Sequence, residues 1–128
     1  MKSKKTILVM DDDPHSGAYL GDLIRYFGFD ADYVETCASA MHRLREKPYD
    51  GLVLDMWMRD GTGRDMLSWL HQSDLKVPVV ITSINADYDQ WIDLVNHGAA
   101  DLLAKPVEPT QLKRALQMAM GEEIGIRT

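Results

Sequence analysis

The chain has 128 residues, of which 45% are hydrophobic, and a formal net charge of −6. This length fits one domain with its own core. The negative charge argues against non-specific nucleic-acid binding, which needs clustered Lys and Arg, and the single cysteine excludes an internal disulfide. No apolar run approaches the roughly 20 residues of a membrane span, and the first residues lack a secretory signal, so we expect a cytoplasmic protein.

The first elements are a buried strand and an amphipathic helix. Residues 6–10 form an apolar run that ends at three aspartates, which is typical of a fully buried strand. Asp13 suits a helix N-cap and Pro14 the first helical position, and Gly28 is placed to end the helix. We therefore predict a helix that begins directly after this strand.

The apolar run of residues 51–55 predicts a strand buried on both faces, as in a parallel sheet. Asp55 lies at its carboxyl end, where open α/β sheets bind ligands. Before it, residues 32–35 predict a short edge strand and residues 38–47 a second helix. After it we predict a helix over 64–73, a strand over 77–82, a helix over 87–97, a strand over 101–104 and a final helix with an inner stripe of Leu112, Ala115, Leu116 and Ala119.

Five strands that alternate with five helices predict an α/β fold, a doubly wound parallel sheet with right-handed crossovers and helices on both faces. We find no linker, low-complexity segment or second domain. We therefore expect residues 1–128 to form a single domain, with a core over about residues 5–120 and a tail, 121–128, that frays.

The residues just past the strands should share one edge of such a sheet. They are Asp11, Asp12, Asp55, Thr82 and Lys105. Three carboxylates in one cleft repel each other, so they either raise a pKa or recruit a cation. Oxygen ligands of this kind suit Mg²⁺, which keeps several of its waters. We therefore predict a Mg²⁺ site whose charge, together with that of Lys105, balances the three aspartates.

In their order and spacing these residues resemble the receiver domain of bacterial two-component response regulators, and the resemblance covers the whole sequence. The matching positions are Asp11-Asp12, Asp55, residues 58–63, Thr82, residues 98–101 and Lys105-Pro106. The resemblance implies the flavodoxin-like strand order 2-1-3-4-5. It also implies a phosphoprotein in phosphorelay signal transduction, which is not a turnover enzyme but assists its own phosphorylation and dephosphorylation.

The resemblance further implies a role for each site residue. Asp12 and Asp55 would bind Mg²⁺ directly together with the main-chain carbonyl of Trp57, while Asp11 holds the ion through water. Asp55 would accept the phosphoryl group. Its donor would be a histidine kinase or a histidine phosphotransfer protein.

Two further residues would contact the phosphoryl group. Lys105 would pair with one of its oxygens, and Thr82 would donate a hydrogen bond to it. The Lys105-Pro106 bond is expected to be cis, which aims the ammonium group back over Asp55. The output domain or partner protein is unknown, we expect neither nucleic-acid nor membrane binding by this domain, and the resemblance allows a phosphorylation-dependent dimer.

The chain departs from the family pattern in a few places. Leu102 stands where the fifth strand usually has an aromatic residue, Arg59 replaces the usual proline, Ser83 replaces a small residue, and Trp57 is bulky at a variable position. Leu102 supports an alternative function, a pseudo-receiver that binds partners without control by phosphorylation. If phosphorylation does switch the protein, we expect the change to centre on residues 82–98.

Other functions fit the sequence less well. A nucleotide-binding flavodoxin-like protein would not place three aspartates after its first strand, because they repel phosphate. A haloacid-dehalogenase-type phosphatase would need its nucleophile where Met58 lies. Cys37 is interpreted as a small buried hydrophobe. The histidines show no shared spacing for a metal and are interpreted as surface or packing residues; they are His15, His42, His71 and His97.

Overall fold

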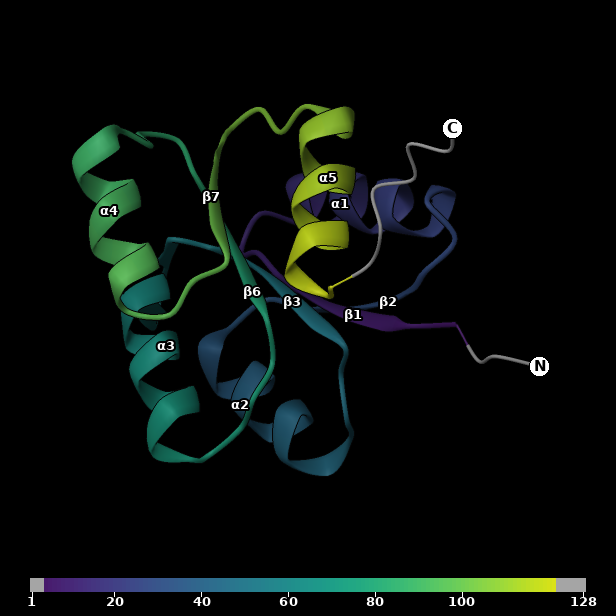
Figure 1. The fold of residues 1–128 in the computed structure, drawn as a ribbon. Helices are drawn as coiled ribbons and strands as arrows, with labels where there is room; N and C mark the ends of the chain where they lie inside the picture. The colour runs from purple at the N-terminus through teal and green to yellow at the C-terminus, as the bar shows by residue number, and fades with distance from the viewer. Residues whose placement is uncertain (1–3, 122–128) are drawn as a thin grey trace.

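The computed structural model describes residues 4–121, and its centre is a five-stranded parallel sheet (Figure 1). The strands are β1 (Thr6–Met10), β2 (Asp30–Val34), β3 (Gly51–Asp55), β6 (Val79–Ser83) and β7 (Asp101–Ala104). Their spatial order is β2-β1-β3-β6-β7, and every pairing between neighbours is parallel. Counted along the chain, this is the predicted order 2-1-3-4-5. The expected doubly wound fold is therefore confirmed.

Helices cover both faces of the sheet (Figure 1). They are α1 (Pro14–Tyr26), α2 (Cys37–Glu46), α3 (Gly63–Gln72), α4 (Tyr88–Asn96) and α5 (Pro109–Ala119). The first and last helices pack on one face and the other three on the opposite face. Alternate residues of a strand therefore enter different cores, as Leu8 and Val9 do. This arrangement explains why the central strands are apolar at nearly every position.

The residues predicted to begin and end helices lie at the helix ends in the structure. The Asp13 side chain accepts a hydrogen bond from the backbone N–H of His15 at 3.0 Å, and Pro14 is the first residue of α1. Gly28 and Gly98 follow α1 and α4 with φ of 99° and 103°, a conformation that L side chains rarely adopt. These signals are local, which is why the sequence alone reveals them.

Two strand boundaries differ from the prediction. The edge strand runs from Asp30 to Val34 and not over the predicted residues 32–35. It begins earlier because Asp30 pairs with Thr6 of β1, although Asp30 is polar. The strand predicted over 77–82 begins only at Val79, directly after Pro78, which has no N–H to donate.

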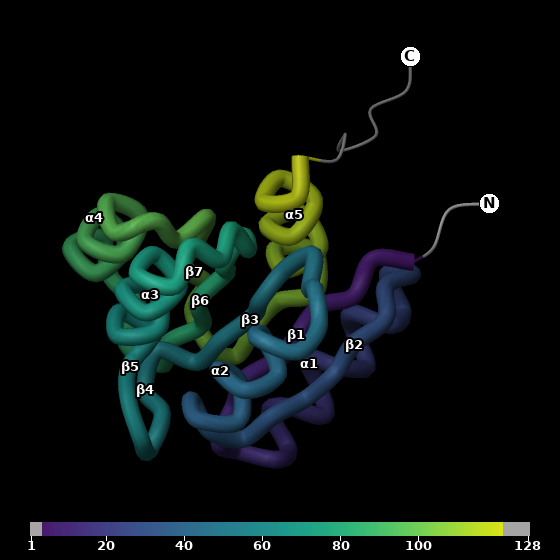
Figure 2. The backbone as a smooth tube through the Cα atoms, turned by 90° about the horizontal axis from the view of Figure 1, so that it is seen from below, coloured from purple at the N-terminus to yellow at the C-terminus, as the bar shows by residue number. Residues whose placement is uncertain are grey.

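A small antiparallel hairpin of β4 (Trp57–Met58) and β5 (Gly61–Thr62) was not predicted. It follows β3 and is visible as a narrow loop at the edge of the molecule in Figure 2. The Asp60 carboxylate in its turn accepts hydrogen bonds from the backbone N–H groups of Cys37 (2.9 Å) and Ala38 (3.1 Å). The hairpin is therefore anchored to the amino end of α2.

Within residues 4–121, no helix is both long and apolar enough to cross a membrane. The fraying predicted for the tail concerns residues that, beyond Gly121, lie outside the described part of the chain.

Candidate functional site

Three aspartates meet where β1 and β3 end. Asp11 and Asp12 follow β1, and Asp55 is the last residue of β3. The two strands are neighbours, with Met10 paired to Leu54, so their carboxyl ends share one edge of the sheet. Each of the three residues offers a carboxylate oxygen, and these oxygens lie within 4.8 Å of one another.

Lys105 brings a positive charge to this acidic cluster of Asp11, Asp12 and Asp55. Its Nζ lies 2.9 Å from Oδ2 of Asp11 and 3.2 Å from Oδ2 of Asp55. The backbone N–H of Lys105 donates to the carbonyl of Ser83 at 2.9 Å, which fixes the start of the loop after β7. The Lys105-Pro106 bond is cis, as predicted.

The electrostatics of the cluster favour an added cation. Burial raises the pKa of Asp55, the ammonium of Lys105 opposes this rise, and the charge of Asp11 adds to it. Burial alone would lower the pKa of Lys105, but its hydrogen bond and attraction to Asp11, and then to Asp55, raise it. Three carboxylates (−3) and one ammonium (+1) leave a formal charge of −2. A divalent cation with oxygen ligands would neutralise this charge.

Thr82 presents a buried hydroxyl group next to Asp55. It lies opposite Asp55 in the pairing of β3 with β6 and is fully buried. Among residues 4–121, its Oγ1 makes no hydrogen bond. A buried hydroxyl without a partner costs roughly 1–3 kcal/mol, so this atom gains if a ligand atom accepts its hydrogen bond.

A polar bridge connects the two loops beside the cluster. The indole Nε1 of Trp57 donates to Oδ1 of Asn85 at 2.9 Å, and the Ser83 hydroxyl donates to the same oxygen at 2.8 Å. The backbone N–H of Trp57 also lies 3.4 Å from Oδ1 of Asp55. The bridge therefore links the end of β3 with the loop after β6. Sequence reasoning missed Asn85, because a loop asparagine carries no signal of a contact 28 residues away.

Arg59 approaches the most exposed aspartate of the cluster. Its Nε lies 3.9 Å from Oδ2 of Asp12, and its side chain is 72% exposed. Exposed pairs of this kind contribute about 0 to 1 kcal/mol. Arg59 is therefore an exposed neighbouring charge and not an integral part of the cluster.

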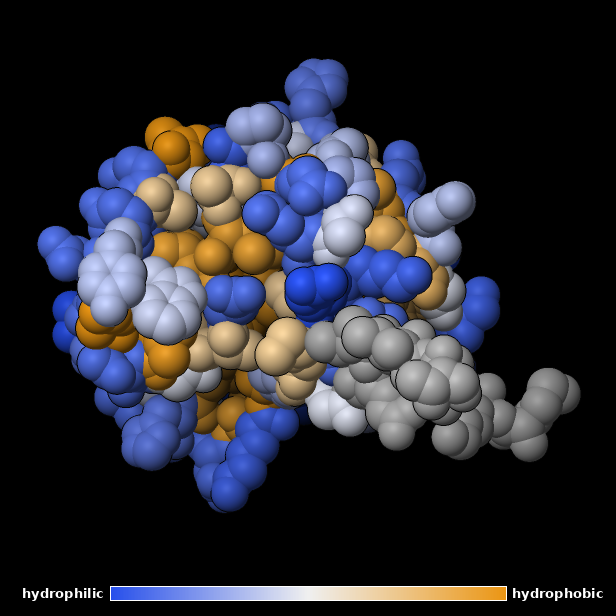
Figure 3. All heavy atoms as spheres, turned by 45° about the horizontal axis from the view of Figure 1, so that its top comes forward, coloured by the Kyte–Doolittle hydropathy of each residue, from blue (hydrophilic) through white to orange (hydrophobic). Residues whose placement is uncertain are grey.

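Large apolar side chains are exposed in the segment after Thr82. Ile84 is 76% exposed, Tyr88 71% and Trp91 40%, and the rings of Tyr88 and Trp91 stack. Figure 3 shows one face of the molecule, on which orange hydrophobic side chains lie among blue hydrophilic ones. Leu102, by contrast, is only 8% exposed and packs in the core under α2, α3 and α4.

The remaining predicted residues lie apart from the cluster. Cys37 is buried, as expected, and burial followed by the nearby charge of Asp60 raises the pKa of its thiol to about 12. All four histidines are exposed.

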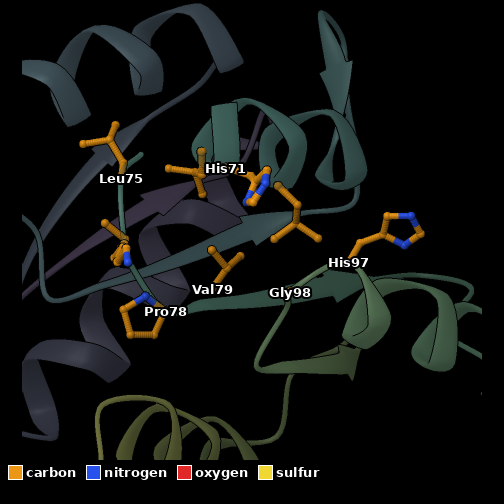
Figure 4. A pocket seen from close by; sticks show the side chains of 10 residues that line it. His71, Leu75, Pro78, Val79, His97 and Gly98 are labelled. Carbon is orange, nitrogen blue, oxygen red and sulfur yellow. The ribbon is translucent and has the colours of Figure 1, made fainter. Parts of the chain in front are cut away.

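A separate pocket of about 390 Å³ lies at the amino end of β6, the end away from Thr82 (Figure 4). His71, Lys76 and His97 line it together with apolar residues. Both α3 and α4 end at this pocket, and the carboxyl ends of helices attract positive charge. This attraction accounts for Lys76 beside the pocket, while the ring of His97 pairs with Arg64 at 2.8 Å.

Comparisons with known proteins agree on one family. The family model described as response regulator receiver domain matches residues 7–117. The response regulator protein PilR of Pseudomonas aeruginosa is 26% identical over 118 residues, which are 92% of this chain and 26% of PilR. The two-component response regulator ORR25 of Oryza sativa is 30% identical over 113 residues, or 87% of this chain and 16% of ORR25. The chain thus spans about a quarter or less of the length of these relatives.

Solved structures show the same fold. The receiver domain of the Francisella response regulator 1452 matches with a TM-score of 0.86 and 23% identity, covering 92% of this chain and 98% of that one. The signal receiver domain of a putative Luxo repressor protein from Vibrio parahaemolyticus matches with a TM-score of 0.87 and 24% identity, covering 93% and 92%.

Proposed function

Because the chain belongs to the family of response regulator receiver domains, we propose that it is phosphorylated on Asp55 in a Mg²⁺-dependent reaction. As a family member it is a signalling module of two-component systems and not a turnover enzyme. The observation that carries the proposal is the buried carboxylate of Asp55, which lies beside two further carboxylates and within 3.2 Å of the Lys105 ammonium. We further propose that residues 1–128 act as one receiver domain.

The acidic cluster has the donor atoms that Mg²⁺ prefers. Asp12 and Asp55 would bind the ion directly with the main-chain carbonyl of Trp57, and Asp11 would hold it through water. In support, the carboxylate oxygens lie within 4.8 Å of one another. When bound, Mg²⁺ would neutralise charge on the phosphoryl group during its transfer.

The side chains of the site suit the proposed transfer. A carboxylate oxygen of Asp55 attacks the phosphorus atom, and the bond from phosphorus to the histidine nitrogen of the donor breaks. The nitrogen keeps the electron pair, and Asp55 becomes an acyl phosphate. Lys105 lies where it can neutralise a phosphoryl oxygen, and the Thr82 hydroxyl, which has no partner among the described residues, can donate to another.

The donor in this proposal is a histidine kinase or a histidine phosphotransfer protein. The signal would leave through the segment after Thr82, where Ile84, Tyr88 and Trp91 are exposed and Asn85 contacts Trp57 at the site. Relatives such as PilR are several times longer, so the output domain would be either attached to this one or separate. In this proposal, the exposed side chains after Thr82 would bind a partner protein or, on phosphorylation, a second copy of the domain.

The pseudo-receiver alternative is not favoured. It rested on Leu102, but the groups that phosphorylation needs are present and close together: Asp55, Lys105 and Thr82.

The proposal is tested by intact mass after incubation with Mg²⁺ and phosphoramidate, a small phosphoryl donor. We expect the wild type to gain the mass of one phosphoryl group, and we expect no gain in Asp55→Asn or in excess EDTA. Asp60→Asn is the matched control, because Asp60 is near Asp55 in sequence but caps α2. An adduct that persists in Asp55→Asn would refute the proposal.

A further inference from the structure

Gly17 is a glycine in the interior of a helix, where glycine ordinarily destabilises the helix relative to alanine. It lies in α1 and is buried. A Cβ atom built at this position would lie 2.2 Å from Cε1 and 2.6 Å from Cζ of Tyr33. The Tyr33 ring therefore rests directly on the backbone of α1, and only glycine leaves it room.

With its ring in this position, Tyr33 places its hydroxyl group against the main chain of Asp11. Tyr33 comes from the edge strand β2, where it pairs opposite Val9 of β1. Its hydroxyl donates a hydrogen bond of 2.7 Å to the main-chain carbonyl of Asp11.

The carbonyl that Tyr33 holds belongs to the peptide that joins Asp11 to Asp12. The Asp11 side chain has other fixed partners, namely the backbone N–H of Asp13 at 2.9 Å and Lys105. The Asp12 side chain has a weaker restraint, the exposed Arg59 at 3.9 Å. The direction of Asp12 therefore depends mainly on the orientation of this peptide.

We propose that Gly17 and Tyr33 form a positioning pair, in which the ring seated on Gly17 orients the Asp11–Asp12 peptide and thereby sets the affinity of the acidic cluster for Mg²⁺. This inference rests on the proposed function, since it assumes that the cluster binds the ion. Neither residue is among the proposed ligands of the ion. Both act through the main chain of Asp11.

The direct test is Tyr33→Phe, which removes only the hydroxyl group. Mg²⁺ alone is titrated into the protein, and binding is followed by tryptophan fluorescence and by NMR shifts of backbone amides. We expect about fivefold weaker Mg²⁺ binding, which corresponds to about 1 kcal/mol and to one lost hydrogen bond.

Tyr49→Phe is the matched control. The Tyr49 hydroxyl makes a hydrogen bond of 2.6 Å to Asp32, so its removal also costs stability, but the acidic cluster is not involved. We expect Tyr49→Phe to lower the melting temperature and to leave Mg²⁺ affinity unchanged. A purely structural role of Tyr33 would make the two variants behave alike.

The role of Gly17 is tested in a second background. Gly17→Ala should weaken Mg²⁺ binding in the wild type by displacing the ring, and should have no further effect in Tyr33→Val, where no ring remains. If Gly17→Ala alone does not fold, Tyr33→Phe still decides the question. Equal Mg²⁺ affinity of wild type and Tyr33→Phe would overturn the inference alone, whereas a wild type that binds no Mg²⁺ would overturn the proposed function with it.

Discussion

Replacing Asp55 with asparagine should stabilise the metal-free protein, although a buried polar residue is being changed. The substitution keeps the shape of the side chain and removes one negative charge from the acidic cluster. The cost of that charge is visible in the pKa of Asp55, which burial raises above its ordinary value. We expect the free energy of unfolding to increase.

The size of the effect follows from the distances. With an effective dielectric constant of about 20, two like charges repel by about 3.5 kcal/mol at 4.8 Å, the upper limit of the separations in the cluster, and Asp55 has two carboxylate neighbours within this distance. The attraction to Lys105 across 3.2 Å is about 5 kcal/mol on the same scale. The partial exposure of Asp12 weakens one repulsion, so we expect Asp55→Asn to gain about 1 to 2 kcal/mol.

The pH dependence of stability checks the sign of the change in unfolding free energy. Because the pKa of Asp55 is raised on folding, its contribution to stability is fully present below the pKa of an unfolded aspartate, about 3.9, and is lost as pH rises through the folded-state pKa. The variant lacks this titration. The difference in unfolding free energy should therefore be largest at neutral pH and disappear in acid.

Urea unfolding in EDTA, followed by circular dichroism, measures the difference. Asp32→Asn is the control with the opposite sign, because hydrogen bonds from Tyr49 and then Lys47 lower the pKa of Asp32 and its charge stabilises the fold. Added Mg²⁺ should stabilise the wild type more than Asp55→Asn. If Asp55→Asn unfolds more easily than the wild type without metal, the charge of Asp55 does not destabilise the metal-free fold and the prediction is wrong.

The remaining predictions concern the switch, the neighbouring charge and the thiol. Hydrogen exchange with and without beryllofluoride, which mimics the phosphoryl group, should change mainly in residues 82–98, and changes centred on Leu102 would contradict this. Arg59→Ala should strengthen Mg²⁺ binding up to about fivefold at low salt, because Arg59 competes with the ion for Asp12; an effect that persists in concentrated salt would show that this reason is wrong. Cys37 should resist alkylation in the folded protein, because it is buried and its thiol pKa is about 12, and a rapid reaction before unfolding would refute this.

Features carried by neighbouring residues could be predicted from the sequence. The start of α1 at Asp13-Pro14 depends on the cap and the proline alone, and the strand over 101–104 was predicted with its observed bounds. The meeting of Asp11 with Asp55 followed from the rule that parallel strands end at one edge of the sheet.

Features that depend on contacts across the fold could not be predicted. The two-residue strands of the hairpin are too short to show a period. Gly17 falls within the first predicted helix, but the sequence does not say which side chain rests on it. The hydrogen bond from Tyr33 to Asp11 could be predicted only if the register of β2 against β1 were known. The start of β2 was predicted two residues too late.

Binding of beryllofluoride, observed by ¹⁹F NMR, tests the central claim most directly, because it requires the acceptor carboxylate and the metal at the same time. In the wild type with Mg²⁺ we expect resonances of bound fluoride at one site per chain. These resonances should be absent in EDTA and in Asp55→Asn, and they should remain in Asp60→Asn. Bound fluoride resonances of equal intensity in Asp55→Asn, or in the wild type without Mg²⁺, would contradict the assignment of Asp55 as the metal-dependent phosphoacceptor.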